Sequence, residues 1–291
     1  MIDALHHGEC LRGVLHITDY EVPKRPDIKV LANSKVFGGY LKTVKHWSDC
    51  NNCYMTFNIF LPEDDVNRQR CEPFPALYFL AGLTSSHENG PFKSGYAPYA
   101  KKHGLAIIFP DTSPRDIPDY PSNHEAFKID DPWRVGYGSG HYCNATQEPW
   151  KKNFNMYTYI TEELPKFVET YFHVSCKKSI MGHSMGGNGA VMITARNPTA
   201  FKSFSAFAPI CAATHTESYY SAPALTAYFG SLEAAREFDG SEVIRSKGKG
   251  FKLPNGLVDF GTADPANKSL MPQNLIDALG SNCHTNVTCR W

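Results

Sequence analysis

The 291-residue sequence lacks several features that would assign it to a large functional class. It has no apolar run of about 18 residues, the length that a membrane-spanning helix requires. Neither sign of charge is in excess, because Lys and Arg total 29 and Asp and Glu total 29, which disfavours nucleic acid or an anionic membrane surface as a partner. Residues 1–33 contain scattered acids and no apolar core of a secretory signal. We therefore expect a globular protein with neither nucleic acid nor a membrane as a partner.

The nine cysteines also lack the regular spacing of a disulfide framework, which indicates free thiols in the reducing cytoplasm. Cys50 and Cys53 form the only closely spaced pair. A zinc or redox role for this pair would need a second pair or a strand–helix redox context, and the sequence has neither. No group of His, Cys, Asp and Glu has the spacing of metal ligands, so we expect no metal and no other cofactor.

What the sequence does contain is an alternation of strand-like and helix-like segments. Short apolar runs predict strands at 53–61, 76–82, 105–110, 203–207 and 256–260. Helices are predicted at 96–103 and at 157–172, where apolar side chains recur on one face. This alternation predicts an α/β fold with a mostly parallel central sheet and helices on both faces. A chain of this length fits one such domain.

The most informative motif is Gly182-His183-Ser184-Met185-Gly186, a Gly-x-Ser-x-Gly sequence. A short apolar strand at 178–181 precedes it and a small-residue helix at 188–195 follows it, as in the nucleophile elbow of an α/β hydrolase. Glycines let the backbone pass through this strained turn, which exposes the serine hydroxyl. A tight turn that packs a helix onto a strand is the alternative, but the flanking segments favour the elbow. We predict that Ser184 is the nucleophile of a serine hydrolase.

The stretch from Ser179 to Ala190 resembles the nucleophile region of S-formylglutathione hydrolases, the esterase D family. Further blocks resemble that family in the same order, at 35–40, 80–84, 110–115, 159–165 and 205–211. The resemblance implies the α/β-hydrolase fold, a cytoplasmic homodimer, and cleavage of S-formylglutathione to glutathione and formate through a formyl-Ser184 intermediate. It covers roughly residue 33 onward, so we expect 34–291 to be a single domain. Residues 1–33 would then be an N-terminal extension, either disordered or an artefact of the gene model.

A serine nucleophile needs an oxyanion hole, an orienting carboxylate and a base. The backbone N–H of Met185, the residue after the nucleophile, is expected to be one oxyanion donor. The resemblance implies Leu83 N–H, after the strand at 76–82, as the second donor, with an ordinary strand-ending turn as the alternative. It also implies Asp264 as the triad acid, and Asp259, inside the preceding strand, is the alternative. A helix cap is the alternative role for Asp264 itself.

The triad histidine is the residue that the sequence does not supply. The order in this fold is Ser, Asp, His, and the family histidine lies in an Asp-His-Ser-Tyr-like block after the last strand. Only His284 follows Asp264, and it is expected in the turn before that strand. The elbow should point His183 elsewhere, and His141, which replaces an aromatic residue of the family, is only a weak surrogate. We therefore expect the C-terminal part to be truncated, as a shortened product or an incomplete gene model.

Departures from the family fall mainly in one long segment, the Pro-, Gly- and Asp-rich residues 116–144. Its first half, 116–131, does not resemble the family, and Asn144 stands where relatives carry an aspartate. Outside it, Ser85 replaces the usual cysteine. We expect this segment to cover the active-site end of the sheet and to crowd the acyl pocket with Trp133, Tyr137 and Tyr142.

Two other functions are consistent with these residues. The first is a broad-specificity carboxylesterase, because the elbow fixes acyl transfer but not the acyl group. The second is a catalytically impaired hydrolase-fold protein that serves in binding, which the absent triad histidine would favour.

Overall fold

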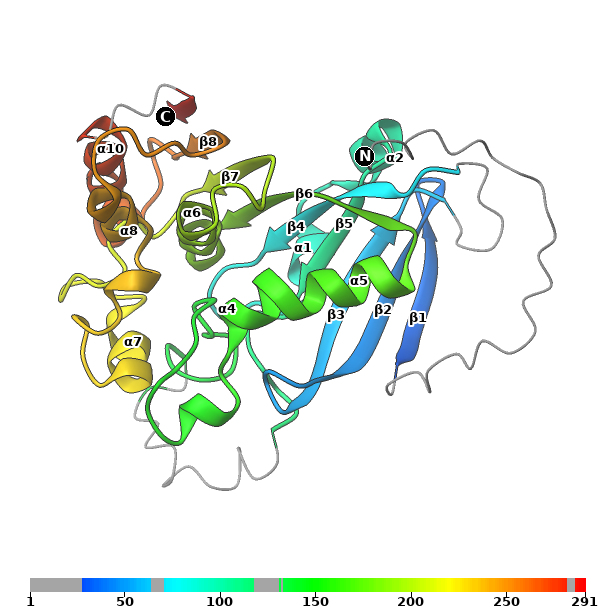
Figure 1. Cartoon of the computed structure of the whole chain (residues 1–291), viewed down its shortest axis with the longest axis horizontal. Helices are drawn as coiled ribbons and strands as arrows, with labels where there is room; N and C mark the ends of the chain where they lie inside the picture. The colour runs from blue at the N-terminus through cyan, green and yellow to red at the C-terminus, as the bar shows by residue number, and fades with distance from the viewer. Residues whose placement is uncertain (1–27, 64–70, 118–130, 132, 282–285) are drawn as a thin grey trace, which may run out of the picture.

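The computed structural model describes residues 28–63, 71–117, 131, 133–281 and 286–291, which build a central sheet covered by helices (Figure 1). The strands are β1 (Lys29–Val36), β2 (Gly39–Ser48), β3 (Cys53–Leu61), β4 (Phe74–Leu80), β5 (Ala106–Pro110), β6 (Val174–His183), β7 (Ser203–Phe207), β8 (Asn255–Asp259) and β9 (Val287–Arg290). They lie in the order β1-β2-β3-β5-β4-β6-β7-β8-β9. The pairings from β1 to β5 are antiparallel and those from β5 to β9 are parallel. This confirms the predicted mostly parallel α/β sheet.

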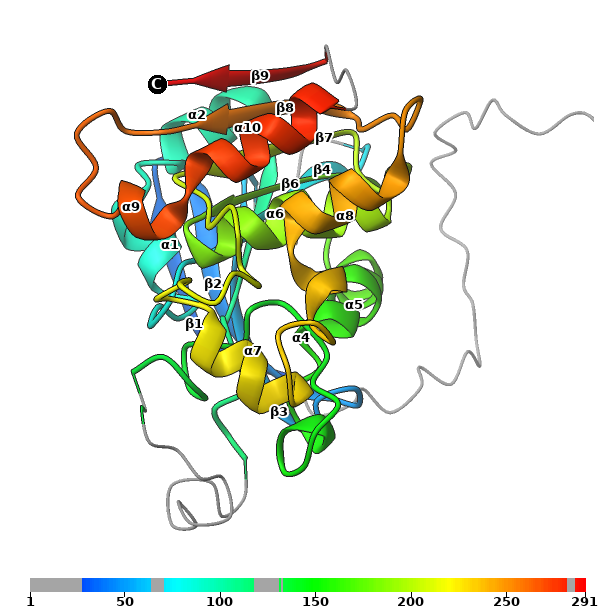
Figure 2. The same cartoon turned by 90° about the vertical axis from the view of Figure 1, so that its left-hand side faces the viewer.

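Helices cover both faces of this sheet. They are α1 (Asn89–Lys93), α2 (Ala97–His103), α4 (Met156–Thr158), α5 (Leu164–Tyr171), α6 (Met185–Arg196), α7 (Ala222–Phe229), α8 (Gly240–Lys247), α9 (Asn267–Leu270) and α10 (Pro272–Ser281), with short helical turns η1 (Trp150–Lys152), η2 (Tyr159–Glu163) and η3 (Arg236–Phe238). On one face, Ala97 and Ala100 of α2 pack with Ile107 and Phe109 of β5. On the other, α5 and α6 contact the sheet, and α8 and then α10 stack outward from α6 (Figure 2).

Most predicted segments coincide with observed elements. The strands predicted at 53–61 and 203–207 match β3 and β7, and the elbow strand and helix are longer than predicted, as β6 and α6. The helix predicted at 157–172 changes type along its length, through the π-helical turn η2 and then α5. Pro165, at the start of α5, has no N–H to donate to the preceding turn. The change of helix type therefore falls where the sequence removes a hydrogen bond.

The N-terminal strands β1 and β2 were not predicted from the sequence. Every residue of β1 except Val36 is exposed, so its side chains carry no alternation of apolar and polar positions. Because β1 begins at Lys29, the domain boundary expected at residue 33 falls inside a strand of the sheet. Residues 1–27 and His284 lie outside the described residues. Within the described ranges, no helix combines the length and the apolar character that a membrane crossing needs.

Candidate active site

Ser184 lies at the sharp turn between β6 and α6, where the parallel strands end (Figure 1). Its backbone angles, φ 57° and ψ −116°, are rare for a residue that carries a side chain. Two backbone hydrogen bonds hold the turn. The Ser184 N–H donates to the Phe207 carbonyl at 2.9 Å, and the Ser184 carbonyl accepts from the Ile210 N–H at 3.2 Å. The turn thus has the strained geometry of a nucleophile elbow.

The two motif glycines are required by close approach of the backbone. A Cβ atom on Gly182 would lie 2.1 Å from the carbonyl oxygen of Gly186, and one on Gly186 would lie 2.0 Å from the carbonyl oxygen of Leu80. Both distances are far below van der Waals contact, so any larger residue would displace α6 from the strand ends. The motif spacing is therefore explained by the packing of α6 against β4 and β6.

A cavity of about 820 Å³ opens at Ser184. Asp264 and Leu83 line it together with Ser184, so the structure brings three predicted site residues to one place. The segments concerned follow β4, β6 and β8, and ligands of open α/β sheets bind at this carboxyl edge of the strands. Apolar and aromatic side chains form much of the remaining wall, namely Phe79, Met181, Phe207, Trp133 and Tyr220.

Two backbone N–H groups next to Ser184 are candidates for an oxyanion hole. Met185 is the first residue of α6, so its N–H has no acceptor within the helix, and the positive end of the helix dipole favours a negative charge there. On the other side, a Cβ atom on Gly82 would lie 3.2 Å from the Cβ of Ser184, so the peptide that leads into Leu83 passes beside the nucleophile. The helix start and the loop after β4 thus flank the hydroxyl that would attack a carbonyl.

Asp264 is half-buried in the loop after β8. Its Oδ1 accepts a hydrogen bond from the N–H of Ala266 at 2.8 Å, whereas its Oδ2 has no hydrogen-bond partner among the described residues. Since Ala266 is the N-cap of α9, Asp264 does secure the start of that helix, and one oxygen remains free for another role. The alternative acid, Asp259, forms an ion pair with Arg290 on β9 and is not among the residues that line the cavity.

His183 lines the same cavity as Ser184 and Asp264, contrary to the expectation that the elbow points it elsewhere. Desolvation lowers the pKa of His183, and the negative charge of Asp264 opposes that shift. No hydrogen bond joins its imidazole to another described residue. The structure therefore places an imidazole near the candidate triad without giving it the bonds of a general base.

The comparison with known proteins agrees with this geometry. Residues 48–251 match the family model described as "Putative esterase". The chain is 38% identical over 256 residues to the S-formylglutathione hydrolase of Mus musculus, covering 86% of this chain and 85% of that protein. With that of Paracoccus denitrificans (strain Pd 1222) the identity is 36% over 253 residues, and the shares are 86% and 85%. The chain belongs to the S-formylglutathione hydrolase family.

A solved structure of this family has the same architecture. The S-formylglutathione hydrolase from Agrobacterium tumefaciens superposes with a TM-score of 0.78 at 36% identity, over 90% of each chain. The overall fold described above is thus the fold of that S-formylglutathione hydrolase.

The aromatic wall of the cavity differs from the one predicted for a member of this family. Trp133 lines the cavity as expected. Tyr137 and Tyr142 do not, because Tyr142 is fully buried and its hydroxyl donates to the carbonyl of Ala81 at 2.8 Å, while Tyr137 packs against the core. Tyr220, from the segment after β7, faces the cavity in their place. No sequence motif identifies Tyr220 as a site residue, because only the tertiary fold brings it to the cavity.

Cys50 and Cys53 are free thiols in the structure. Burial raises the pKa of Cys53 to about 12 and raises that of Cys50 further, which disfavours the thiolate that disulfide exchange requires. Within the described part of the chain, no three His, Cys, Asp or Glu side chains gather as metal ligands.

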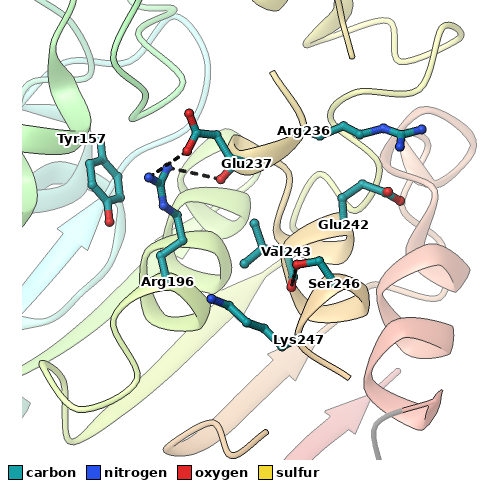
Figure 3. A pocket seen from close by; sticks show the side chains of 8 residues that line it. All are labelled: Tyr157, Arg196, Arg236, Glu237, Glu242, Val243, Ser246 and Lys247. Atoms are coloured by element: carbon teal, nitrogen blue, oxygen red, sulfur yellow. Dashed lines mark hydrogen bonds and ion pairs between the residues drawn. The ribbon is translucent and has the colours of Figure 1, made fainter. Parts of the chain in front are cut away.

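A second cavity, of about 590 Å³, lies between α6 and α8, away from the elbow (Figure 3). Its charged side chains already have partners within the protein. The Arg196 guanidinium stacks 4.2 Å from the ring centroid of Tyr157 and forms an ion pair with Glu237 at 3.0 Å. Glu242 is paired with Arg245. This arrangement is that of a surface ion-pair network rather than of a catalytic site.

His141 is buried and does not line the Ser184 cavity. Its Nε2 has no hydrogen-bond partner among the described residues, and burial lowers the pKa of its imidazole to about 4. A neutral imidazole without access to the cavity cannot take the proton of Ser184. The placement of His141 therefore argues against its predicted role as a surrogate base.

Replacing His141 with phenylalanine is expected to reduce the acid sensitivity of the fold and to leave the reactivity of Ser184 unchanged. The unfolded chain protonates His141 near pH 6.5 and the folded chain only near pH 4, so this contribution is fully present above pH 6.5 and is lost as the pH falls towards 4. The difference corresponds to about 3 kcal/mol. Urea unfolding of both proteins across this range measures it. If the free energy of unfolding has the same pH dependence in both proteins, burial does not lower the pKa of His141. If the variant loses Ser184 reactivity, His141 is a candidate for the base after all.

Proposed function

We propose that this chain hydrolyses S-formylglutathione to glutathione and formate. The observation that carries the proposal is the strained Ser184 at the elbow, which shares one cavity with Leu83 and Asp264. The identity of 36–38% to S-formylglutathione hydrolases over 86% of the chain supports the same substrate.

Ser184 is the nucleophile in this proposal. Its Oγ gives its proton to the base and attacks the formyl carbon. The carbonyl electrons move onto the oxygen, where the N–H groups of Leu83 and Met185 stabilise the negative charge. Collapse of this intermediate breaks the C–S bond, and the glutathione thiolate takes a proton from the base. Water then attacks formyl-Ser184 through a second oxyanion, which releases formate and restores the hydroxyl.

Asp264 is the acid of the triad in this proposal, with its free Oδ2 available to orient a histidine. The base in this proposal is a histidine that reaches both Asp264 and Ser184. Among the histidines of the described ranges only His183 lines the cavity, and it immediately precedes the nucleophile in the sequence.

The cavity wall next to Ser184 leads us to expect that small acyl groups react best. Trp133 and Tyr220 line the cavity that opens at Ser184, and each methylene that does not fit costs about 1–3 kcal/mol in transition-state binding. The kcat/KM values for formyl, acetyl and butyryl thioesters of glutathione, each divided by its spontaneous hydrolysis rate, should fall in that order.

Matched variants test the same expectation. Trp133→Ala should raise the butyryl-to-formyl ratio, whereas Tyr219→Ala, at an exposed neighbour that does not line the cavity, should leave it unchanged. A butyryl preference in the parent protein would favour a broad-specificity carboxylesterase instead.

The cellular setting follows from the same proposal. We place the protein in the cytoplasm, since the described cysteines are all free thiols, as is usual in that reducing compartment. A homodimer, which the family resemblance implies, stays a prediction that size-exclusion chromatography with light scattering would test.

A further inference from the structure

A second residue with a strained backbone, Thr84, lines the same cavity as Ser184. Thr84 has φ 66°, in the left-handed region that a β-branched side chain rarely adopts. It follows Leu83, whose N–H is the second oxyanion donor of the proposed function. Strain of this kind persists only where the surrounding structure holds the backbone in place. The contacts that hold Thr84 therefore also hold the loop that carries the Leu83 N–H.

One support comes from the segment between β5 and α4. The Thr84 N–H donates to the carbonyl of Gly138 at 2.9 Å, and the Gly138 N–H in turn donates to Oγ of Ser113 at 2.8 Å. The approach is so close that a Cβ atom on Gly138 would lie 2.8 Å from the Cα of Thr84. Gly138 also has φ +79°, which favours glycine on its own account.

The other support comes from the segment directly after β5. The carbonyl of Ser85 accepts a hydrogen bond from Nη2 of Arg115 at 2.8 Å and another from the hydroxyl of Thr112. Arg115 is itself fixed, because its Nε donates to both carboxylate oxygens of Asp111, at 2.9 and 3.0 Å, and Asp111 is 3% exposed. Hydrogen bonds thus hold the loop of residues 83–85 at two points, the N–H of Thr84 and the carbonyl of Ser85.

We propose that Gly138 and Arg115 are positioning residues that fix the Leu83 N–H at the distance and direction an oxyanion requires. The inference rests on the proposed function, in which Leu83 is a donor. Neither Gly138 nor Arg115 lines the cavity, so neither touches the substrate. Because the oxyanion exists only in the transition state, loosening the loop should slow the chemical step and leave substrate binding nearly unchanged.

The variant Gly138→Ala tests the first support, with Gly230→Ala as the matched control. Gly230 has a similar φ of +81°, but a Cβ there would meet only the Gln147 side chain, at 3.5 Å or more. We expect Gly138→Ala to lower the rate constant for phosphonylation of Ser184 by about 10²–10³, the effect of losing one oxyanion donor. The half-saturating concentration should change by less than about threefold. Amide hydrogen exchange of residues 83–85 should become faster. The control Gly230→Ala should leave both the phosphonylation kinetics and the exchange rates unchanged.

The variant Arg115→Lys tests the second support at a half-exposed position, where misfolding is less of a concern. Lysine keeps the charge beside Asp111 but cannot reach both the carboxylate and the Ser85 carbonyl, so we expect about a tenfold loss of rate with faster loop exchange. Unchanged exchange at 83–85 in both variants would overturn the proposal, as would faster exchange with an unaltered phosphonylation rate. If Ser184 is not phosphonylated even when a histidine base reaches it, the proposed function fails. Exchange at residues 83–85 still decides whether the hydrogen bonds from Gly138 and Arg115 hold this loop.

Discussion

Replacing Ser184 with alanine is expected to abolish covalent capture by a fluorophosphonate. The reagent bonds to the serine oxygen at the elbow, and alanine offers no atom for that bond. In a chain with a complete triad, the same change is expected to lower kcat by about 10⁶. Intact-protein mass spectrometry after labelling measures the first effect, and hydrolysis of S-formylglutathione measures the second.

Two other serines provide controls for this result. Ser85 lines the same cavity, and Ser139 is buried with its hydroxyl donated to the carbonyl of Arg134. The variants Ser85→Ala and Ser139→Ala should still be labelled at Ser184. Labelling of Ser85 or Ser139 in the Ser184→Ala protein would show that the elbow does not carry the nucleophile.

Supplying a histidine base is expected to raise the activity of the printed 291-residue chain by about 10³-fold or more. If no histidine of the chain reaches Ser184, its hydroxyl keeps its proton, and triad deletions leave only about 10³–10⁴ over the uncatalysed rate, from the oxyanion hole and binding. The experiment joins to Trp291 the histidine-containing segment that follows the last strand in S-formylglutathione hydrolases. Ester hydrolysis by the 291-residue chain is then compared with that of the extended chain. An extended chain whose added histidine is replaced with alanine is the control.

The increase in ester hydrolysis that the added histidine brings should depend on Asp264. In the extended chain, Asp264→Asn is expected to lower kcat by about 10⁴, whereas Asp259→Asn, which only removes the ion pair to Arg290, should retain it. If the printed chain already turns over like an ordinary esterase, another histidine must be the base. His183→Ala would then be the first variant to make, because His183 lines the cavity and His141 does not.

The segments that could be predicted are those whose side chains carry a pattern of their own. Apolar residues predicted β3, whose second half is buried on both faces, and β7, whose buried positions alternate with half-buried ones. The exposed β1 has no such pattern, and its place in the sheet depends on hydrogen bonds to β2. The π-helical turn η2 was also missed, since side-chain periodicity does not distinguish it from the α-helix that continues it.

The sequence by itself determined the α/β fold and the elbow at Ser184, because strand, turn and helix are contiguous there and close approach forces glycine at fixed spacing. Only the tertiary structure decided which aspartate lies in the cavity, that His183 faces it and His141 is buried, and that Tyr220 rather than Tyr142 forms its wall. These outcomes depend on contacts between segments far apart in the chain. The direction of a side chain in such contacts is set by strand register and by the backbone around it, which local residue patterns do not encode.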